Sequence, residues 1–110
     1  MTDKIVVLST CGSEKEARRI ARGLVDARLA ACVAATPGTV SVYHWKGAIE
    51  ESAEWSLVIK TRRDLFRAVC AEIRRLHSYE LPEIVALQIV DGSPEYLEWM
   101  DQELRPAEAE

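Results

Sequence analysis

The sequence predicts a small α/β (α+β) domain, a ferredoxin-like sandwich with a long hairpin and one extra helix at its C-terminal end. Hydrophobic periodicity predicts the order strand, helix, strand, strand, helix, strand, helix, which is the order of two interlaced β-α-β units followed by an added helix. The chain has 110 residues, 48% of them hydrophobic. That length and composition fit one core, so we expect a single domain over residues 1–110 with its core at about residues 4–104.

The first strand and the first helix follow one another directly. Ile5–Leu8 is a β-branched apolar run ending at a turn over residues 9–12, which is typical of a buried central strand. Ser13 and Glu16 have the spacing of a capping box. Apolar side chains then recur at helical spacing from Ala17 to Val25, so we expect an amphipathic helix that packs on the sheet.

A long hairpin should follow this helix. Residues 29–35 are small and apolar, Pro37 and Gly38 interrupt them, and residues 39–45 alternate in polarity. Because proline cannot donate to a strand ladder, Pro37 predicts an edge strand or a bulge. Lys46 and Gly47 predict the turn, and residues 55–61 predict the returning strand.

The second half of the chain should add a helix, a strand and a last helix. Leu65, Val69, Ile73 and Leu76 lie on one helical face that ends near His77. Residues 84–90 predict the last strand, and Ser93 followed by Pro94 predicts the start of the extra helix. We expect residues 105–110 to form a frayed polar tail.

Composition limits the classes of function. The 18 acidic and 14 basic residues leave a net charge of −4, which does not favour nucleic acid as a partner. Three cysteines without CxxC spacing do not indicate a disulfide framework, and a reducing compartment is expected. The chain begins without a signal-peptide pattern and has no long apolar run, so we expect a cytoplasmic protein with no membrane contact. Signatures of common enzymes are not found, which predicts a protein that is not an enzyme.

A few residues could bind a metal. Cys11 comes just before the predicted helix N-terminus, where the helix dipole favours a thiolate, although a packed turn cysteine is the more ordinary interpretation. His77 follows the second helix and can equally be a structural residue there. Tyr79, Glu80 and Glu83 follow within six residues in a loop, which adds a phenol and two carboxylates.

Three segments, residues 29–33, 43–47 and 77–84, resemble the CutA family of divalent-cation tolerance proteins, and the resemblance runs from about Lys4 to Leu104. It implies a homotrimer and a divalent-metal site, of copper type or for zinc, with His77 and Glu83 as ligands and a cysteine near the end of the first strand. The position of the family's cysteine is Ser9 here. Cys11 lies two residues later and would point to the same strand face.

The resemblance also implies clefts between subunits. Lys60, Tyr79 and Glu80 are candidates for binding a small ligand there. Tyr43, Trp45 and Pro37 are candidates for the trimer interface, since aromatic side chains concentrate in assembly contacts. An alternative function is a regulatory trimer similar to the signalling protein PII, which would bind a small anionic effector or an unknown protein partner through the same clefts.

Overall fold

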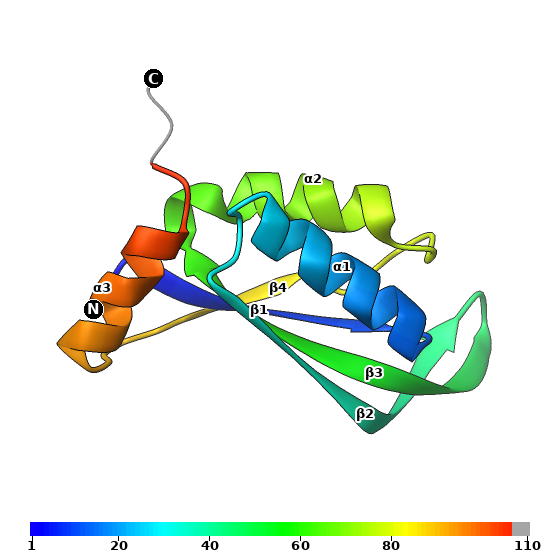
Figure 1. Cartoon of the computed structure of the whole chain (residues 1–110). Coiled ribbons are helices and arrows are strands. Elements are labelled where there is room, and N and C mark those ends of the chain that lie inside the picture. The colour runs from blue at the N-terminus through cyan, green and yellow to red at the C-terminus, as the bar shows by residue number, and fades with distance from the viewer. Residues whose placement is uncertain (107–110) are drawn as a thin grey trace.

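The computed structural model describes residues 1–106 and contains one antiparallel sheet of four strands in the order β2-β3-β1-β4. Helices α1 and α2 lie side by side across one face of this sheet (Figure 1). This arrangement confirms the predicted ferredoxin-like topology. In chain order the elements are β1 (Lys4–Cys11), α1 (Glu14–Asp26), β2 (Cys32–Trp45), β3 (Ala48–Arg62), the 3-10 turn η1 (Arg63–Leu65), α2 (Phe66–Leu76), β4 (Val85–Gln88) and α3 (Pro94–Glu103).

The core lies between the sheet and the two helices. Alternate residues of β1 and β3 point into it, and the inward side chains of α1 and α2 close it from the other side. These core residues are all but inaccessible to solvent, and they include Val7, Ile20, Leu24, Ile59 and Ile73. The central position of β1, between β3 and β4, confirms the prediction of a buried central strand.

Helix α1 begins as predicted but with a different carboxylate contact. The Ser13 hydroxyl is the N-cap and accepts from the Glu16 backbone N–H at 3.1 Å. The Glu16 carboxylate accepts from the Gly12 N–H at 3.3 Å, whereas a capping box would place this contact at Ser13. Further along, a Cβ at Gly23 would stand 2.5 Å from Leu76 Cδ1, so this glycine allows α1 and α2 to approach closely.

The hairpin of β2 and β3 is the longest feature of the fold. Its pairing runs from Cys32 opposite Lys60 to Trp45 opposite Ala48, with a register shift between Thr36 and Thr39. This shift confirms the bulge predicted at Pro37, and β2 is an edge strand. Lys46 and Gly47 both have positive φ, 52° and 85°, which is the geometry of a tight hairpin turn. The hairpin extends beyond the helical layer (Figure 1), and the molecule measures 44 × 25 × 25 Å.

Strand β4 is shorter than the predicted residues 84–90. It pairs with β1 only from Val85 to Gln88, after which the Ile89 N–H donates to the Lys4 carbonyl and the chain turns toward α3. Val85 and Leu87 are exposed on this edge strand, as are Val40, Val42 and Ile49 on the hairpin. Such apolar surface on a single chain is typical of an assembly contact, and the homotrimer stays a prediction.

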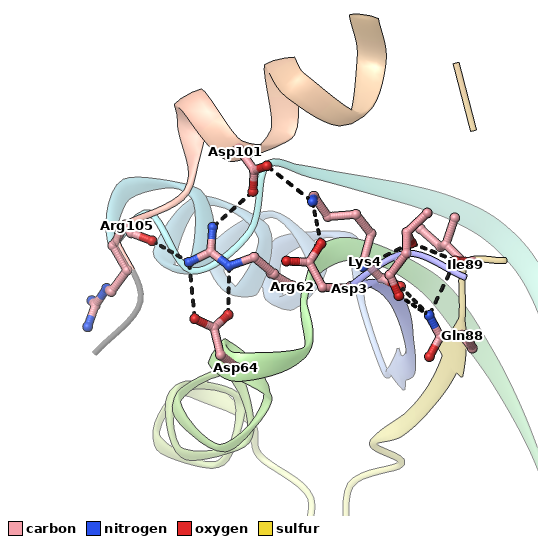
Figure 2. Close-up of polar contacts among 9 residues, drawn as sticks. Asp3, Lys4, Arg62, Asp64, Gln88, Ile89, Asp101 and Arg105 are labelled. Atoms are coloured by element: carbon pink, nitrogen blue, oxygen red, sulfur yellow. Dashed lines mark hydrogen bonds and ion pairs between the residues drawn. The ribbon is translucent and has the colours of Figure 1, made fainter. Parts of the chain in front are cut away.

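Helix α3 is attached to the end of the sheet by an ion-pair network. Figure 2 shows Asp101 of α3 between Lys4 of β1 and Arg62 of β3, with distances of 3.2 Å to each cation. Both cations are buried, and each has a second carboxylate, Asp3 or Asp64. Buried cations need such partners because leaving them alone is costly.

The prediction of a frayed tail over residues 105–110 is wrong for Arg105, the first of these residues. The Arg105 N–H donates to the Arg28 carbonyl, and its guanidinium donates to the Ala27 carbonyl at 2.9 Å. These contacts hold the chain against the end of α1. Residues 107–110 of the predicted tail lie outside the described residues. Within residues 1–106, no helix combines the length and the apolar character that crossing a membrane requires.

Candidate functional site: a groove between the hairpin and the loop before β4

A groove of about 1000 Å³ lies between the hairpin and the loop that joins α2 to β4. Residues 41–45, Ser52 and Glu54 of the hairpin form one wall, residues 78–83 form the other, and Thr10 of β1 lies at the end of the sheet between them. We call this space the hairpin groove. Thr10 alternates with the core-facing Ser9 and Cys11 along β1, so the groove opens on the sheet face opposite the helices.

Glu54 is the buried acid of the groove. Only 6% of its surface is exposed. Its Oε2 accepts from the Tyr79 hydroxyl at 2.7 Å, and its Oε1 accepts from the Ser41 hydroxyl at 2.5 Å. Burial and the neighbouring Glu54 carboxylate raise the pKa of Tyr79, so the phenol is a protonated donor at neutral pH. The contact therefore joins the hairpin to the loop.

Two further acids line the other wall. Glu80 and Glu83 are exposed on the loop and face the same groove. Lys46 at the hairpin turn reaches Glu80 at 4.0 Å, but it is not one of the lining residues. The described residues that line the groove include three glutamates and no lysine or arginine. The site is therefore suited to a cation rather than an anion.

His77 fastens the start of this loop to the end of β1. Its Nε2 lies 2.7 Å from the Thr10 carbonyl, and its Nδ1 lies 3.1 Å from the Tyr79 backbone N–H. A carbonyl only accepts and a backbone N–H only donates, so the ring is neutral, with the proton on Nε2 and a lone pair on Nδ1. In this arrangement both ring nitrogens already have partners. A metal ion at Nδ1 would have to displace the Tyr79 N–H.

Glu16 holds the same loop from the helix side. Its buried carboxylate accepts from the Ser78 N–H at 2.8 Å and from the Gly12 N–H at 3.3 Å, and Arg19 lies 3.5 Å away. Burial acts to raise the pKa of Glu16, but the hydrogen bonds from Ser78 and Gly12 outweigh it and the pKa is lowered. The carboxylate is thus charged at neutral pH and ties residues 77–79 to the N-terminus of α1.

Cys11 is separate from the groove. It is fully buried on the helix side of β1, as is Ser9, which confirms that the two residues share a strand face. Its thiol lies 3.6 Å from the Ser13 carbonyl, to which it donates. Burial raises the pKa of the Cys11 thiol, so the expectation that the helix dipole would favour a thiolate here is wrong. Desolvation outweighs the dipole because no solvent reaches the sulfur.

The three predicted metal ligands do not form a closed site in the chain. Within residues 1–106 there is no group of three or more His, Cys, Asp or Glu side chains placed to hold a metal ion. Cys11 faces the core, His77 is hydrogen-bonded at both nitrogens, and Glu83 is exposed at the groove wall. A metal bound by one chain would therefore need ligands that the described part of the chain does not bring together.

The remaining predicted residues fall in two places. Tyr43 and Trp45 line the hairpin groove together with Tyr79 and Glu80. Lys60 lies elsewhere, with its Nζ 5.2 Å from the centre of the Tyr96 ring of α3 and 3.3 Å from the Tyr96 hydroxyl. The structure therefore does not bring Lys60 into the groove with Tyr79.

Pro37, which the resemblance places in the trimer interface, lies exposed at the bulge of the edge strand β2. An exposed edge strand can accept another chain, and its role in assembly stays a prediction.

Sequence reasoning missed Glu54, Ser41 and Glu16 as residues of the site. Glu54 lies in a polar stretch of the hairpin with Glu50 and Glu51, where a charge is normally solvent-exposed. No local signal distinguishes Glu54 from these neighbours, because its burial depends on a loop that follows 25 residues later. Glu16 did carry a signal, its spacing from Ser13, but that spacing indicated only a helix cap.

Comparison with known protein families shows a match over most of the chain. The profile of the family described as CutA1 divalent ion tolerance protein matches residues 5–103. Among relatives, "Divalent-cation tolerance protein CutA" of Thermus thermophilus is 47% identical over 95 residues, covering 86% of this chain and 92% of the relative. "Protein CutA" of Mus musculus is 46% identical over 93 residues, and the match covers 84% of this chain but only 52% of the mouse protein. The chain thus spans about half the length of that mammalian relative.

Solved structures agree with this match. CutA of Xylella fastidiosa has a TM-score of 0.92 at 43% identity, with 94% of this chain and 100% of that chain covered. The divalent cation tolerance protein of Thermus thermophilus has a TM-score of 0.90 at 44% identity, with 93% of this chain and 99% of that chain covered. The relatives come from several compartments, since one is named as chloroplastic in Arabidopsis thaliana and one as periplasmic in Archaeoglobus fulgidus.

Proposed function

The chain belongs to the CutA1 family of divalent ion tolerance proteins, and from this premise we propose that it binds a divalent cation at the hairpin groove as part of a homotrimer. The observation that supports this function most is the charge of the groove, where three glutamates and no lysine or arginine line the described walls. Such a surface attracts cations and raises their local concentration.

We propose two ligands, Glu83 on the groove wall and His77, which directly precedes the wall residue Ser78 but does not itself line the groove. Imidazole nitrogen and carboxylate oxygen suit zinc and copper(II), and copper binds more tightly to most such sites. His77 Nδ1 carries the lone pair, and it becomes free when the Tyr79 N–H moves away. Cys11 is the weakest of the three predicted ligands because its thiol is buried on the opposite sheet face and kept protonated.

A neighbouring subunit is the proposed source of the missing coordination. Residues 1–106 of one chain do not assemble three ligands, and four-coordinate zinc sites need three or four. The exposed apolar residues of the edge strands and hairpin, including Val42, Ile49 and Leu87, favour contacts between copies. We keep Tyr43, Trp45 and Pro37 as proposed interface residues.

We propose a binding role rather than catalysis, in a reducing compartment such as the cytoplasm. Three free cysteines support the choice of compartment. The PII-like alternative, in which Lys60, Tyr79 and Glu80 hold an anionic effector, gains no support from the groove. Lys60 lies outside it, and Glu54 and Glu83 would repel an anion.

Native mass spectrometry of the protein titrated with Cu²⁺ and with Zn²⁺ tests this proposal. A trimer that takes up a metal ion on each chain is expected. Uptake should weaken by about tenfold or more in His77→Ala and in Glu83→Gln, a size typical of losing a contributing ligand. Glu83 is the cleaner variant, because its side chain is exposed and makes no described hydrogen bond or ion pair, whereas His77 also holds the loop.

The control is Glu98→Gln, which removes an exposed carboxylate of α3 outside the groove. Uptake that is unchanged in both ligand variants would contradict the assignment of the site. A monomer at micromolar concentration would contradict the assembly.

A further inference from the structure

The two helices that cover the sheet contain most of the basic residues of a chain that is acidic overall. Helix α1 (Glu14–Asp26) and the η1–α2 segment (residues 63–76) together contain eight basic and five acidic residues, whereas the whole chain has 14 basic and 18 acidic residues. These elements therefore have a net charge of +3, and the remaining residues have a net charge of −7. Charge is thus segregated between the helical layer and the rest of the chain.

The acidic residues of the helical layer are mostly neutralised by ion pairs. Four of them lie within 3.5 Å of a cation, in the pairs Glu14–Arg18, Glu16–Arg19, Asp64–Arg62 and Glu72–Arg75. Within residues 1–106, five basic residues of the layer form no ion pair, namely Lys15, Arg22, Arg63, Arg67 and Arg74. They face one unpaired acid in the same range, Asp26, so positive charge is in excess on this layer.

The unpaired cations are exposed to solvent. Lys15 and Arg22 are seven residues apart on α1, as are Arg67 and Arg74 on α2, so each pair lies on one face of its helix, about two turns apart. The buried side chains of both helices pack on the sheet, and the exposed faces therefore point away from it. Figure 1 shows the two helices side by side over the sheet. We call their exposed surface the outer helical face.

The chemistry of this face fits carboxylates. Four of the five unpaired cations are arginines, and a planar guanidinium can donate two parallel hydrogen bonds to one carboxylate. Among the described residues of the two helices, Val25 is the one large hydrophobic side chain that is exposed, whereas a helix that lies on a membrane needs an apolar face.

A short anion suits this face better than a long one. A long nucleic acid would extend beyond the helices over the rest of the chain, whose net charge of −7 repels it. A short acidic peptide segment fits within the outer helical face and avoids this repulsion. Charge complementarity therefore favours an acidic protein segment over a membrane or a nucleic acid.

We propose that the outer helical face binds an acidic segment of a partner protein, rich in aspartate and glutamate and poor in apolar side chains. Arg22 of α1 and Arg67 and Arg74 of α2 pair with its carboxylates, and electrostatic attraction speeds the encounter. None of these arginines lines the hairpin groove, so this proposal does not rest on the proposed metal site.

The probe is an end-blocked peptide of about eight glutamates, titrated into the assembled, metal-free protein in a calorimeter. We expect binding at about 50 mM NaCl that weakens severalfold at about 300 mM, because exposed charges are screened. In the double variant Arg22→Gln, Arg74→Gln, affinity should fall about fivefold or more, since each exposed ion pair contributes a factor of about two to five. A Gly-Ser peptide of the same length should not bind.

The matched control is the double variant Lys46→Gln, Gln102→Glu. It lowers the net charge by the same amount at exposed positions outside the two helices, and its affinity should stay within about twofold of the wild type. Arg22 and Arg74 make no described hydrogen bond or ion pair, so their double variant should keep the melting temperature and the oligomeric state of the wild type. Thermal melts and analytical ultracentrifugation check both properties.

Absence of peptide binding at low salt, or an equal loss of affinity in the two double variants, would overturn the proposal. Vesicles of phosphatidylserine and phosphatidylcholine, and an oligothymidylate, are the competing ligands. If either binds through Arg22 and Arg74 more tightly than the glutamate peptide does, an acidic protein segment is the wrong partner. Metal uptake that persists without peptide binding would contradict this proposal alone, and peptide binding without metal uptake would contradict only the metal site.

Discussion

The Tyr79 hydroxyl donates a 2.7 Å hydrogen bond to the buried carboxylate of Glu54 and thereby joins the loop before β4 to the long hairpin. The two residues are separated by 25 positions in the chain. They lie on opposite walls of the hairpin groove, so this contact ties the two walls together.

We expect Tyr79→Phe to lower the free energy of unfolding by about 1–2 kcal/mol, because a hydrogen bond to a charged group is lost and Glu54 stays buried. Urea denaturation at a fixed protein concentration measures this change. The loss should shrink in a Glu54→Gln background, as a double-mutant cycle requires for a direct contact. Tyr96→Phe is the control, since among residues 1–106 the Tyr96 hydroxyl has one hydrogen-bond partner, the Lys60 ammonium at 3.3 Å. An equal loss in both backgrounds would contradict the coupling.

The Glu16 carboxylate should make stability depend on pH. Its pKa in the folded state is lowered from 4.5, so its contribution is fully present above the unfolded-state pKa and is lost as pH falls through the lowered folded-state pKa. We expect Glu16→Gln to lose about 1–2 kcal/mol at pH 7, because an amide cannot accept from both the Ser78 and Gly12 N–H groups.

The difference between wild type and Glu16→Gln should narrow below about pH 4, where the wild-type carboxylate takes up its proton. Thermal melts at several pH values measure it. Glu14→Gln is the control, since Glu14 forms an exposed pair with Arg18 that contributes at most about 0.5 kcal/mol. A constant difference from pH 7 to pH 3 would exclude Glu16 as the titrating group.

Ser9 carries a buried hydroxyl without a hydrogen-bond partner in the described structure. Ser9→Ala should therefore leave stability unchanged or raise it by about 1 kcal/mol, because the cost of desolvating the hydroxyl disappears. Thr61→Val is the informative comparison. The Thr61 hydroxyl is equally buried but donates to the Leu29 carbonyl at 2.6 Å, so its loss should cost about 1–3 kcal/mol. Guanidinium denaturation of both variants checks the contrast, and a large loss in Ser9→Ala would reveal a partner for Ser9.

We expect the ion pairs of Asp101 to stabilise the packing of α3 against the end of the sheet. In Asp101→Asn, Lys4 and Arg62 each keep one aspartate, Asp3 or Asp64, so we expect a loss of about 1 kcal/mol rather than the 3–5 kcal/mol of a fully broken buried pair. Hydrogen exchange of the α3 amides should become faster. Glu98→Gln, on the same helix without an ion pair among the described residues, should change neither quantity. Unchanged exchange in Asp101→Asn would show that Met100 and Leu104 hold the helix without help from the network.

Thiol reactivity should distinguish the three cysteines. Burial raises the pKa values of the Cys11 and Cys70 thiols, whereas Cys32 is only half-buried. Since the thiolate is the reactive form, Cys32 should react first with Ellman's reagent in the native protein at pH 8. The Cys32→Ser variant should lose the fast phase. A fast phase that persists in this variant would show that Cys11 or Cys70 is accessible.

The local elements could be predicted wherever one segment contains its own signal. Ser13 and Ser93 cap α1 and α3 as their spacing indicates, and Pro37 lies at the bulge of an edge strand. The limits of β4 could not be predicted in this way. Ile89 and Val90 are as apolar as the strand before them, but pairing ends at Gln88 because the antiparallel partner strand β1 begins only at Lys4.

The candidate site was predicted in part. Tyr79, Glu80 and Glu83 do line the hairpin groove, since they lie in one short loop and the sequence places them together. Cys11 was expected to favour a thiolate, but the fold buries it on the other face of the sheet. Neighbouring residues of a strand point to opposite faces of the sheet. The residues around Cys11 do not indicate which of these faces the helices will cover.

The amino-acid sequence by itself determined the order of elements and the turn at Lys46, because periodicity, caps and turn residues act over a few positions. The resemblance of residues 29–33, 43–47 and 77–84 indicated the family. Only the tertiary structure decided that Glu54 is buried against Tyr79, that Glu16 holds the Ser78 N–H, and that both nitrogens of His77 are occupied. Except for the local contact of His77 Nδ1 with the Tyr79 N–H, these contacts join residues 25 to 67 positions apart. Burial and charge pairing depend on such distant neighbours, and the fold alone brings them together.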